Sequence, residues 1–212
     1  MYTKFHGAAE SIQPDKVLRE RYFPDYGYIG LFLDVGAGDP ILISNSYHFR
    51  QNGWKILSVE PNSRFVEKYR QDGFTIAECV VGSKNGEILF EELNLAHVGG
   101  NVHDLHPHVF NPQNGVISLK PLRTLDSLLS EEFSPLIAGE KIDIISLDVE
   151  LYETEVLKGL TDVRYFPSVF LIEAHEIIRD DIREWMTAHE YTLDFQVAHN
   201  QYYVRQGFFR AS

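Results

Sequence analysis

Short hydrophobic runs alternate with amphipathic stretches along most of the chain. The continuous apolar runs, each closed by glycine, proline or polar residues, lie at 29–35, 55–60, 75–81, 141–150 and 168–174. Such runs are typical of strands buried in a sheet. Apolar residues at helical spacing follow in residues 44–50, 61–69, 153–160 and 180–189. This alternation predicts an α/β fold with a mostly parallel, twisted sheet and helices on both faces.

Three segments depart from the alternation. Residues 1–28 are polar and aromatic and predict a helical extension or lid, with a helix over 15–21. Strands at 86–92 and 116–122 flank residues 93–115, which predict a long loop and a candidate substrate lid. Residues 191–205 predict an antiparallel hairpin that turns near His199 and Asn200 at one edge of the sheet. We expect residues 1–212 to form a single domain.

Composition narrows the classes of partner. The 212 residues carry a formal net charge of −12, so a nucleic-acid backbone or an anionic membrane is a poor partner, because both require clustered Lys and Arg. The single cysteine, Cys79, cannot form an intrachain disulfide or a Cys-rich zinc site. No signal-peptide or membrane-spanning run is found in the sequence, and we expect a cytoplasmic protein with a small-molecule partner. The composition does not decide whether the protein forms an oligomer.

The stretch LFLDVGAGDP, at residues 31–40, places a glycine turn directly after a predicted strand. In open α/β sheets, ligands bind beyond the carboxyl ends of the strands. The third glycine of the dinucleotide motif is missing, and Asp34 would repel a pyrophosphate. The same carboxylate favours S-adenosylmethionine, which carries a sulfonium and an ammonium group. Glu60 ends the next predicted strand, where it can accept hydrogen bonds from both ribose hydroxyls.

Several motifs together resemble the FkbM-type methyltransferases. They are FLDVGAGD, ILISNSYHF, GWKILSVEPN, PLRTLDSLL and IDIISLDVELYETEVLKGL, and the resemblance spans about residues 29–205. The chain departs from the family pattern at two positions. Pro40 stands where the family usually has a glycine, and Leu151 stands where a glycine usually follows Asp-Val-Glu.

The resemblance implies an S-adenosylmethionine-dependent methyltransferase with a Rossmann-like, class I fold and a seven-stranded sheet. It also implies where the cofactor lies. Together with the glycine turn and Glu60, it gives the expected cofactor-binding residues as Asp34, Gly36, Ala37, Gly38, Asp39, Ser44, Asn45, Glu60, Pro61, Asn62, Val81 and Gly82.

Acidic residues and a histidine follow two neighbouring predicted strands. Asp148 and Glu150 are two positions apart on an expected extended segment, so their side chains would face the same way. Glu173 and His175 repeat this spacing on the next strand. We expect Asp148, Glu150 and His175 to be catalytic, with His175 as general base. Alternatively, Asp148, Glu173 and His175 hold a divalent metal such as Mg²⁺ or Mn²⁺ that activates the substrate hydroxyl.

A histidine-rich segment lies within the predicted loop, at residues 97–108. His97, His103, His106 and His108 could gather a second metal, zinc. The interpretation we favour is a polar lid that closes over substrate, hinged at Gly99 and Gly100.

The function that these patterns favour is O-methylation of a small hydroxylated molecule, such as a sugar or a natural-product intermediate. Two other classes stay open. One is a catalytically silent domain that binds S-adenosylmethionine. The other is an NAD-dependent oxidoreductase, against which Asp34 and the missing third glycine argue.

Overall fold

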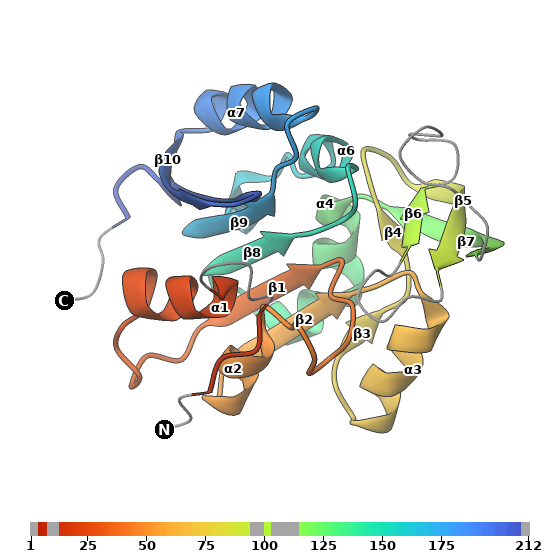
Figure 1. Ribbon diagram of the computed structural model, residues 1–212, viewed down its shortest axis with the longest axis horizontal. Helices are drawn as coiled ribbons and strands as arrows, with labels where there is room; N and C mark the ends of the chain where they lie inside the picture. Colours follow the sequence, from red (N-terminus) through yellow and green to blue (C-terminus); the bar gives the residue numbers. More distant parts are fainter. Residues whose placement is uncertain (1–3, 8–12, 94–99, 103–114, 209–212) are drawn as a thin grey trace.

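A seven-stranded sheet forms the centre of the protein. The computed structural model describes residues 4–7, 13–93, 100–102 and 115–208. The strand order is β10-β11-β9-β8-β1-β2-β3 (Figure 1), with β1 at Leu31–Val35, β2 at Lys55–Val59, β3 at Ile76–Ala77, β8 at Ile144–Leu147, β9 at Val169–Glu173, β10 at Tyr191–Val197 and β11 at Asn200–Arg205. The pairs among β3, β2, β1, β8 and β9 are parallel, whereas β11 runs antiparallel to β9 and to β10. The predicted mostly parallel sheet with an antiparallel closing hairpin is therefore confirmed.

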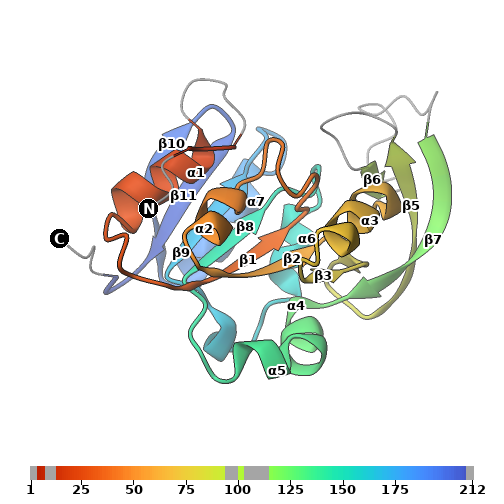
Figure 2. The same ribbon diagram turned by 90° about the horizontal axis from the view of Figure 1, so that it is seen from below.

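Helices cover both faces of this sheet, as predicted. Figure 2 shows α1 (Pro14–Val17) and α2 (Tyr47–Gln51) on one face and α4 (Leu125–Ser127) and α5 (Ser134–Ile137) on the other. The first face buries Leu18 and Phe49 against Phe32 of β1, and the second buries Leu128 against Leu33. Successive strand residues point to opposite faces, so a strand between two helical layers must be apolar throughout. The remaining α-helices are α3 (Ser63–Gln71), α6 (Glu153–Lys158) and α7 (Arg179–Ala188). Two π-helical turns, η1 (Leu18–Tyr22) and η2 (Leu128–Glu132), and one 3-10 helix, η3 (Val163–Tyr165), complete the helical segments of the described residues.

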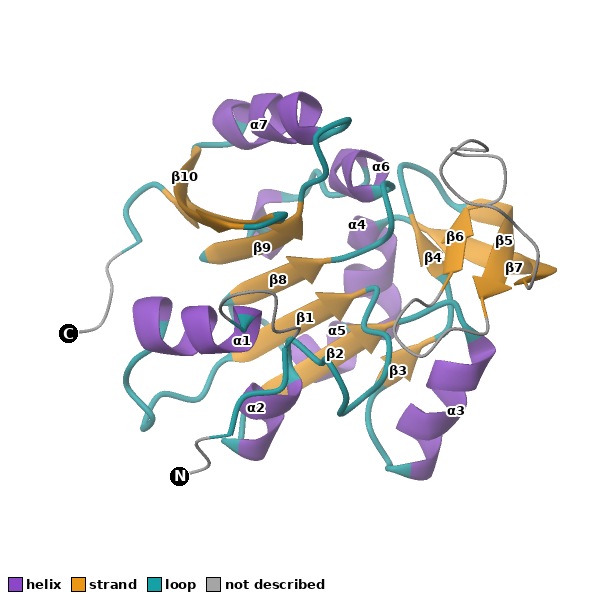
Figure 3. Cartoon of the chain, in the orientation of Figure 1, coloured by secondary structure: helices purple, strands orange, loops and turns teal. Residues whose placement is uncertain are grey.

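A second, four-stranded sheet lies beside the carboxyl end of the first (Figure 3). Its order is β4-β7-β5-β6, with β4 at Val80–Val81, β5 at Gly86–Leu93, β6 at Gly100–Val102 and β7 at Gly115–Arg123. Its small core is formed by Val80, Phe90, Val102 and Leu122. The sequence did not predict this separate sheet.

Two predicted boundaries are wrong in this region. The predicted strand over 75–81 divides into β3, which pairs with β2, and β4, which pairs with β7. The predicted loop over 93–115 is interrupted by β6, because residues 100–102 pair with β5 and bury Val102 against Phe90. The four histidines of the predicted lid lie outside the described residues, and the lid and its zinc alternative stay predictions.

Other elements are shorter than the sequence indicated. The predicted strand over 141–150 is reduced to β8, because the backbone turns after Leu147 and adopts positive φ angles of 54° at Glu150 and 72° at Leu151. The helix predicted from residue 44 begins at Tyr47, whose backbone N–H donates to Ser44 Oγ at 3.1 Å. Ser44 thus acts as a turn residue before α2.

Candidate functional site

A recess lies at the carboxyl end of β1, where the glycine turn was predicted to bind a ligand. Its lining comes from the end of β1, the following turn and the end of β8, and it includes Asp34, Gly36, Ala37, Gly38, Asp39, Leu42, Ile43, Asn45 and Asp148. We call it the glycine-turn recess. Six of the residues predicted to bind the cofactor are in this lining.

The two glycines of the turn have different physical roles. Gly36 has φ of +76°, and a Cβ there would lie 1.7 Å from the carbonyl oxygen of Asp148. Only glycine therefore allows β1 and the end of β8 to approach this closely. Gly38 has φ of +56°, but a Cβ there would meet nothing within 4 Å. Gly38 thus faces open space, where a ligand can approach the backbone.

Asp34 is the buried acid of the recess. Its side chain is 2% exposed, and burial raises its pKa to about 6, against a smaller opposing effect of the Ser46 hydroxyl and the Arg50 charge. Its Oδ2 atom has no hydrogen-bond partner among the described residues. A buried carboxylate oxygen without a partner is costly unless a ligand supplies a donor or a positive charge. This atom fits a cationic cofactor.

Glu60 lies at the end of β2 and faces the same turn. Its Oε2 accepts from the Gly38 N–H at 2.9 Å and its Oε1 accepts from the Asn62 N–H at 2.8 Å. Burial raises the pKa of Glu60 to about 7. Each carboxylate oxygen has two acceptor positions, so Glu60 can hold the turn in place and also accept from a ribose diol.

The segment between the glycine turn and α2 narrows the recess. Asp39 Oδ1 accepts from the N–H groups of Ile41 and Leu42, and Lys68 pairs with Oδ2 of the same carboxylate. Asn45 Nδ2 donates to Ser146 Oγ on β8 at 3.3 Å. The enclosed volume is about 50 Å³, well below the roughly 300 Å³ of the smallest typical ligand pockets. A recess of this size does not enclose a whole nucleoside. The parts predicted for Ser44, Pro61, Asn62, Val81 and Gly82 in cofactor binding stay predictions.

A chain of polar side chains crosses from β8 to the end of β9. Burial, the charge of Glu173 and a hydrogen bond with Glu173 raise the pKa of Asp148 well above its usual range. Glu173 Oε2 lies 3.4 Å from His175 Nε2. The structure thus brings together Asp148, Glu173 and His175, as expected from neighbouring strand ends.

Glu150 reaches this edge by a different route from the one predicted. The sequence interpretation placed Asp148, Val149 and Glu150 on one extended segment, which is wrong, because Glu150 has φ of 54°. Leu151 also has a positive φ, 72°, at the position where the family usually has glycine. A left-handed backbone explains the family's preference for glycine there. Burial and the charges of Asp148 and Glu60 raise the pKa of Glu150 to about 7.

The sequence analysis missed two residues of this edge, Glu153 and His199. Glu153 begins α6, and its Oε1 accepts from the Val149 N–H at 2.9 Å; burial raises its pKa to about 8. The His199 ring stacks on the His175 ring with centroids 4.5 Å apart. His199 lies in the turn between β10 and β11, and its carbonyl accepts from the Ala174 N–H at 2.7 Å. We call Asp148, Glu150, Glu153 and Glu173 the acidic edge.

The predicted metal site is not supported by this arrangement. Within the part of the chain that the structure describes, no three His, Cys, Asp or Glu side chains are grouped closely enough to hold a metal ion. Asp148 and Glu173 instead share a hydrogen bond, which requires a proton between them. The metal site stays a prediction.

The comparison with protein-family models decides the family. The model described as the methyltransferase FkbM domain matches residues 34–193, which is more than half of the chain. The chain belongs to the FkbM methyltransferase family. The match begins at Asp34 and includes the glycine-turn recess and the acidic edge. A search of curated proteins found no match.

Membership of the FkbM family implies a Rossmann-like fold and S-adenosylmethionine as methyl donor, and confirms the resemblance seen in the motifs. It gives no support to the NAD-dependent oxidoreductase. None of the described helices is both long enough and apolar enough to cross a membrane.

Proposed function

We propose that this FkbM methyltransferase transfers a methyl group to a hydroxyl oxygen of a small molecule. The observation that carries the proposal is the chain of Asp148, Glu173 and His175 beside the glycine-turn recess. In this proposal, the chain supplies a proton acceptor beside the expected methyl donor. Hydroxyl methylation needs such an acceptor, because the attacking oxygen must lose its proton as the new bond forms.

Each residue of the site has a role in the proposed reaction. S-adenosylmethionine supplies an electrophilic methyl group on a cationic sulfur when it is bound. Asp34 and Glu60 hold its positively charged and ribose portions. His175 accepts the hydroxyl proton as the oxygen–carbon bond forms and the sulfur–carbon bond breaks. Glu173, 3.4 Å from Nε2, fixes the ring and stabilises its protonated form.

Positioning accounts for most of the rate enhancement in this proposal. Methyl transfer requires the oxygen, the methyl carbon and the sulfur to lie in line, and holding two reactants so aligned contributes roughly 7–11 kcal/mol at best. Asp148 connects the two halves of the site, because its carbonyl oxygen contacts Gly36 and its carboxyl contacts Glu173. We propose that it orients the substrate hydroxyl between donor and base.

The test is a transfer assay with radiolabelled S-adenosylmethionine and a panel of hydroxylated sugars and phenols, with and without a chelator. We expect the wild type to transfer the methyl group to at least one member of the panel. The Asp148→Asn variant should bind the donor with unchanged affinity in calorimetry, but its turnover should fall at least about 100-fold. Donor binding without transfer to any member of the panel would favour the catalytically silent binding domain. An Asp148→Asn variant as active as wild type would refute the role of Asp148. Loss of activity with chelator would favour the predicted metal site instead.

A further inference from the structure

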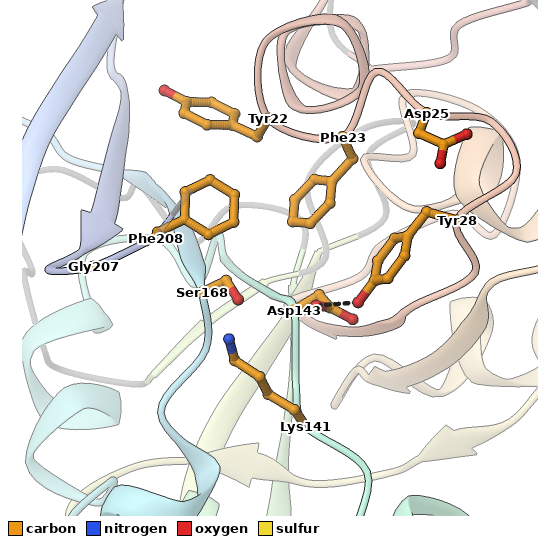
Figure 4. A pocket seen from close by; sticks show the side chains of 9 residues that line it. All are labelled: Tyr22, Phe23, Asp25, Tyr28, Lys141, Asp143, Ser168, Gly207 and Phe208. Carbon is orange, nitrogen blue, oxygen red and sulfur yellow. Dashed lines mark hydrogen bonds between the residues drawn. The ribbon is translucent and has the colours of Figure 1, made fainter. Parts of the chain in front are cut away.

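A second cavity lies at the opposite end of the central sheet from the glycine-turn recess. It encloses about 300 Å³ between the segment before β1, the residues that precede β8 and β9, and the residues after β11 (Figure 4). We call it the aromatic cavity. Asp143 in its wall directly precedes β8, whereas Asp148 directly follows that strand. Five residues of extended chain span about 16 Å, so this cavity is separate from the proposed methyl-transfer site.

Aromatic rings form one side of the cavity. The rings of Phe23 and Tyr28 are nearly parallel, 13° apart with centroids separated by 6.2 Å, and Phe208 lies 5.8 Å from Phe23. Trp54 packs edge-on against Phe23 and Tyr28, at 5.1 and 5.8 Å, and fixes their orientation. Figure 4 shows the three rings side by side, facing the polar residues. Fixed ring faces favour a flat aromatic ligand, which stacks on them or meets them edge to face.

Polar groups form the opposite side. Asp143, 5% exposed, accepts from the Tyr28 hydroxyl at 2.8 Å through Oδ1 and from the Leu31 N–H at 3.0 Å through Oδ2. Neither the Lys141 ammonium nor the Ser168 hydroxyl forms a hydrogen bond through its side chain within the described residues. Figure 4 shows the Ser168 hydroxyl directed toward Asp143, and the Lys141 ammonium directed toward Ser168 and the space below the rings. The cavity therefore offers unused donors at Lys141 and Ser168 beside the remaining acceptor positions of Asp143.

The charges of this wall select against an ionic ligand. Lys141 and Asp143 carry opposite charges and interact with one another. The other acid of the lining, Asp25, is exposed, and its Oδ1 accepts from the Gly27 N–H at 2.7 Å. Figure 4 shows Asp25 beyond the rings, on the side away from Lys141. An anion would meet the buried carboxylate and a cation would meet the ammonium, whereas an uncharged ring avoids both repulsions. Its edge must present an acceptor to Lys141 or Ser168 and, next to it, a donor to Asp143.

We propose that the aromatic cavity is a binding site for an uncharged nitrogen heteroaromatic ring that carries a hydrogen-bond donor next to an acceptor, the pattern at the edge of a nucleobase. The ring stacks against Phe23, Tyr28 and Phe208. Its acceptor receives a hydrogen bond from Lys141 and its amino group donates to Asp143. The volume of about 300 Å³ lies at the lower end of the range of small-molecule pockets, which suits a single base better than a larger compound.

The test uses cytosine as probe and the full chain saturated with S-adenosylhomocysteine, so that the methyl-donor site is already filled. Titration followed by amide chemical shifts should give a Kd on the order of 1 mM, with the largest shifts around Tyr28, Asp143 and Phe208. 1,N4,N4-Trimethylcytosine, which has no N–H donor on either edge, should bind at least about 10-fold more weakly.

Two substitutions test the walls without disturbing the central sheet. Lys141 is exposed and Phe208 is half-buried, so Lys141→Met and Phe208→Ala should fold, as a dispersed amide spectrum would verify. Each should weaken cytosine binding about 10-fold or more, whereas Asp34→Asn in the distant recess should leave it unchanged. Absence of cytosine binding, equal binding of the trimethyl analogue, or unchanged binding by Lys141→Met would overturn the proposal. Because the methyl-donor site is filled, failure here says nothing against methyl transfer.

Discussion

Asp34→Asn should make the protein more stable while weakening its binding of S-adenosylmethionine. The substitution keeps the shape of the side chain and removes its charge. Burial raises the pKa of Asp34 to about 6, compared with 3.8 for an ordinary carboxyl. When the carboxyl is ionised in both the folded and the unfolded chain, that difference in pKa lowers the free energy of unfolding by about 3 kcal/mol.

The pH dependence follows from the sign of this shift. Above pH 6, Asp34 is ionised in the folded and the unfolded chain, and the full penalty of about 3 kcal/mol applies. Between about pH 6 and pH 4 the folded protein takes up a proton that the unfolded chain still lacks, and the penalty declines. Asparagine does not titrate. The variant should therefore exceed the wild type in stability by up to about 3 kcal/mol at pH 7.5, and by little at pH 4.

Urea unfolding at pH 7.5 and pH 4 measures the stability difference, and calorimetry at pH 7.5 measures the donor affinity. Loss of a hydrogen bond to a charged group is worth about 1.5–3 kcal/mol, which is roughly a 10- to 150-fold increase in Kd. Asp39→Asn is the matched control in the same recess. Burial raises the pKa of Asp39, but hydrogen bonds from Lys68, Leu42 and Ile41 outweigh it and hold the pKa below its usual value. Asparagine at position 39 should therefore destabilise the protein at pH 7.5.

The two readouts refute different parts of the reasoning. If Asp34→Asn is no more stable than wild type at pH 7.5, or if its advantage persists at pH 4, burial does not penalise the carboxylate as argued. If the donor Kd is unchanged, Asp34 does not contact the donor, whatever the stability shows.

Three further predictions concern the same site. Burial raises the pKa of Glu60 to about 7, so donor affinity measured by calorimetry should increase from pH 6 to pH 8 as this carboxyl ionises; a flat profile would contradict its part in binding. Gly36→Ala should lower Tm far more than Gly38→Ala, because only the first places a Cβ 1.7 Å from the Asp148 carbonyl oxygen, and equal effects in thermal unfolding would disprove the packing argument. His175→Gln should lower kcat roughly 100-fold or more with little change in donor Kd; an unchanged kcat would assign the base elsewhere.

The central sheet could be predicted because its strands are buried on both faces. Phe32 and Leu33 are adjacent in β1, and each is buried in a different one of the two large hydrophobic cores. A strand in that position has an uninterrupted run of apolar residues, and such a run strongly indicates a buried strand from local sequence alone. The helices that cover it are equally visible, because the buried residues Phe65, Val66 and Tyr69 of α3 recur at helical spacing.

The second sheet lacks such a signal because its pairing is remote and its outer face is exposed. Leu89 of β5 and its partner Leu119 of β7 are 47% and 57% exposed. Their alternation marks strands but not the sheet to which they belong. β4 has two residues, and its partners in β7 lie about forty positions further along the chain. β6 consists of Gly100, Asn101 and Val102, and only pairing with β5 makes these residues a strand.

The candidate site shows the same division between local and non-local information. Asp34, Gly36, Gly38 and Glu60 follow strand ends directly, so a single run of sequence indicates each of them. His199 lies in a hairpin turn, and its place beside His175 depends on the register in which Asn200 of β11 opposes Glu173 of β9. The sequence did predict the hairpin at the sheet edge that contains His199. The sequence did not show that β11 pairs with β9, and this pairing is what brings the His199 ring against the His175 ring.

The acidic edge and the glycine-turn recess together explain why a site of this kind is both unstable and useful. Burial raises the pKa of Asp34, Glu60, Glu150 and Glu153 to values between about 6 and about 8. For Asp34 alone the penalty at neutral pH is about 3 kcal/mol, a large share of a total stability of roughly 5–15 kcal/mol. Removing the charge of Asp34 should stabilise the fold at neutral pH and remove negative potential that would attract a sulfonium. Glu60 and Glu153 differ, because each also accepts from backbone N–H groups that an apolar residue would leave unpaired. We therefore expect Asp34 to act as a binding group for a cationic donor. Gly36, by contrast, is required by the fold itself, because its lack of a Cβ lets the ends of β1 and β8 meet at Asp148.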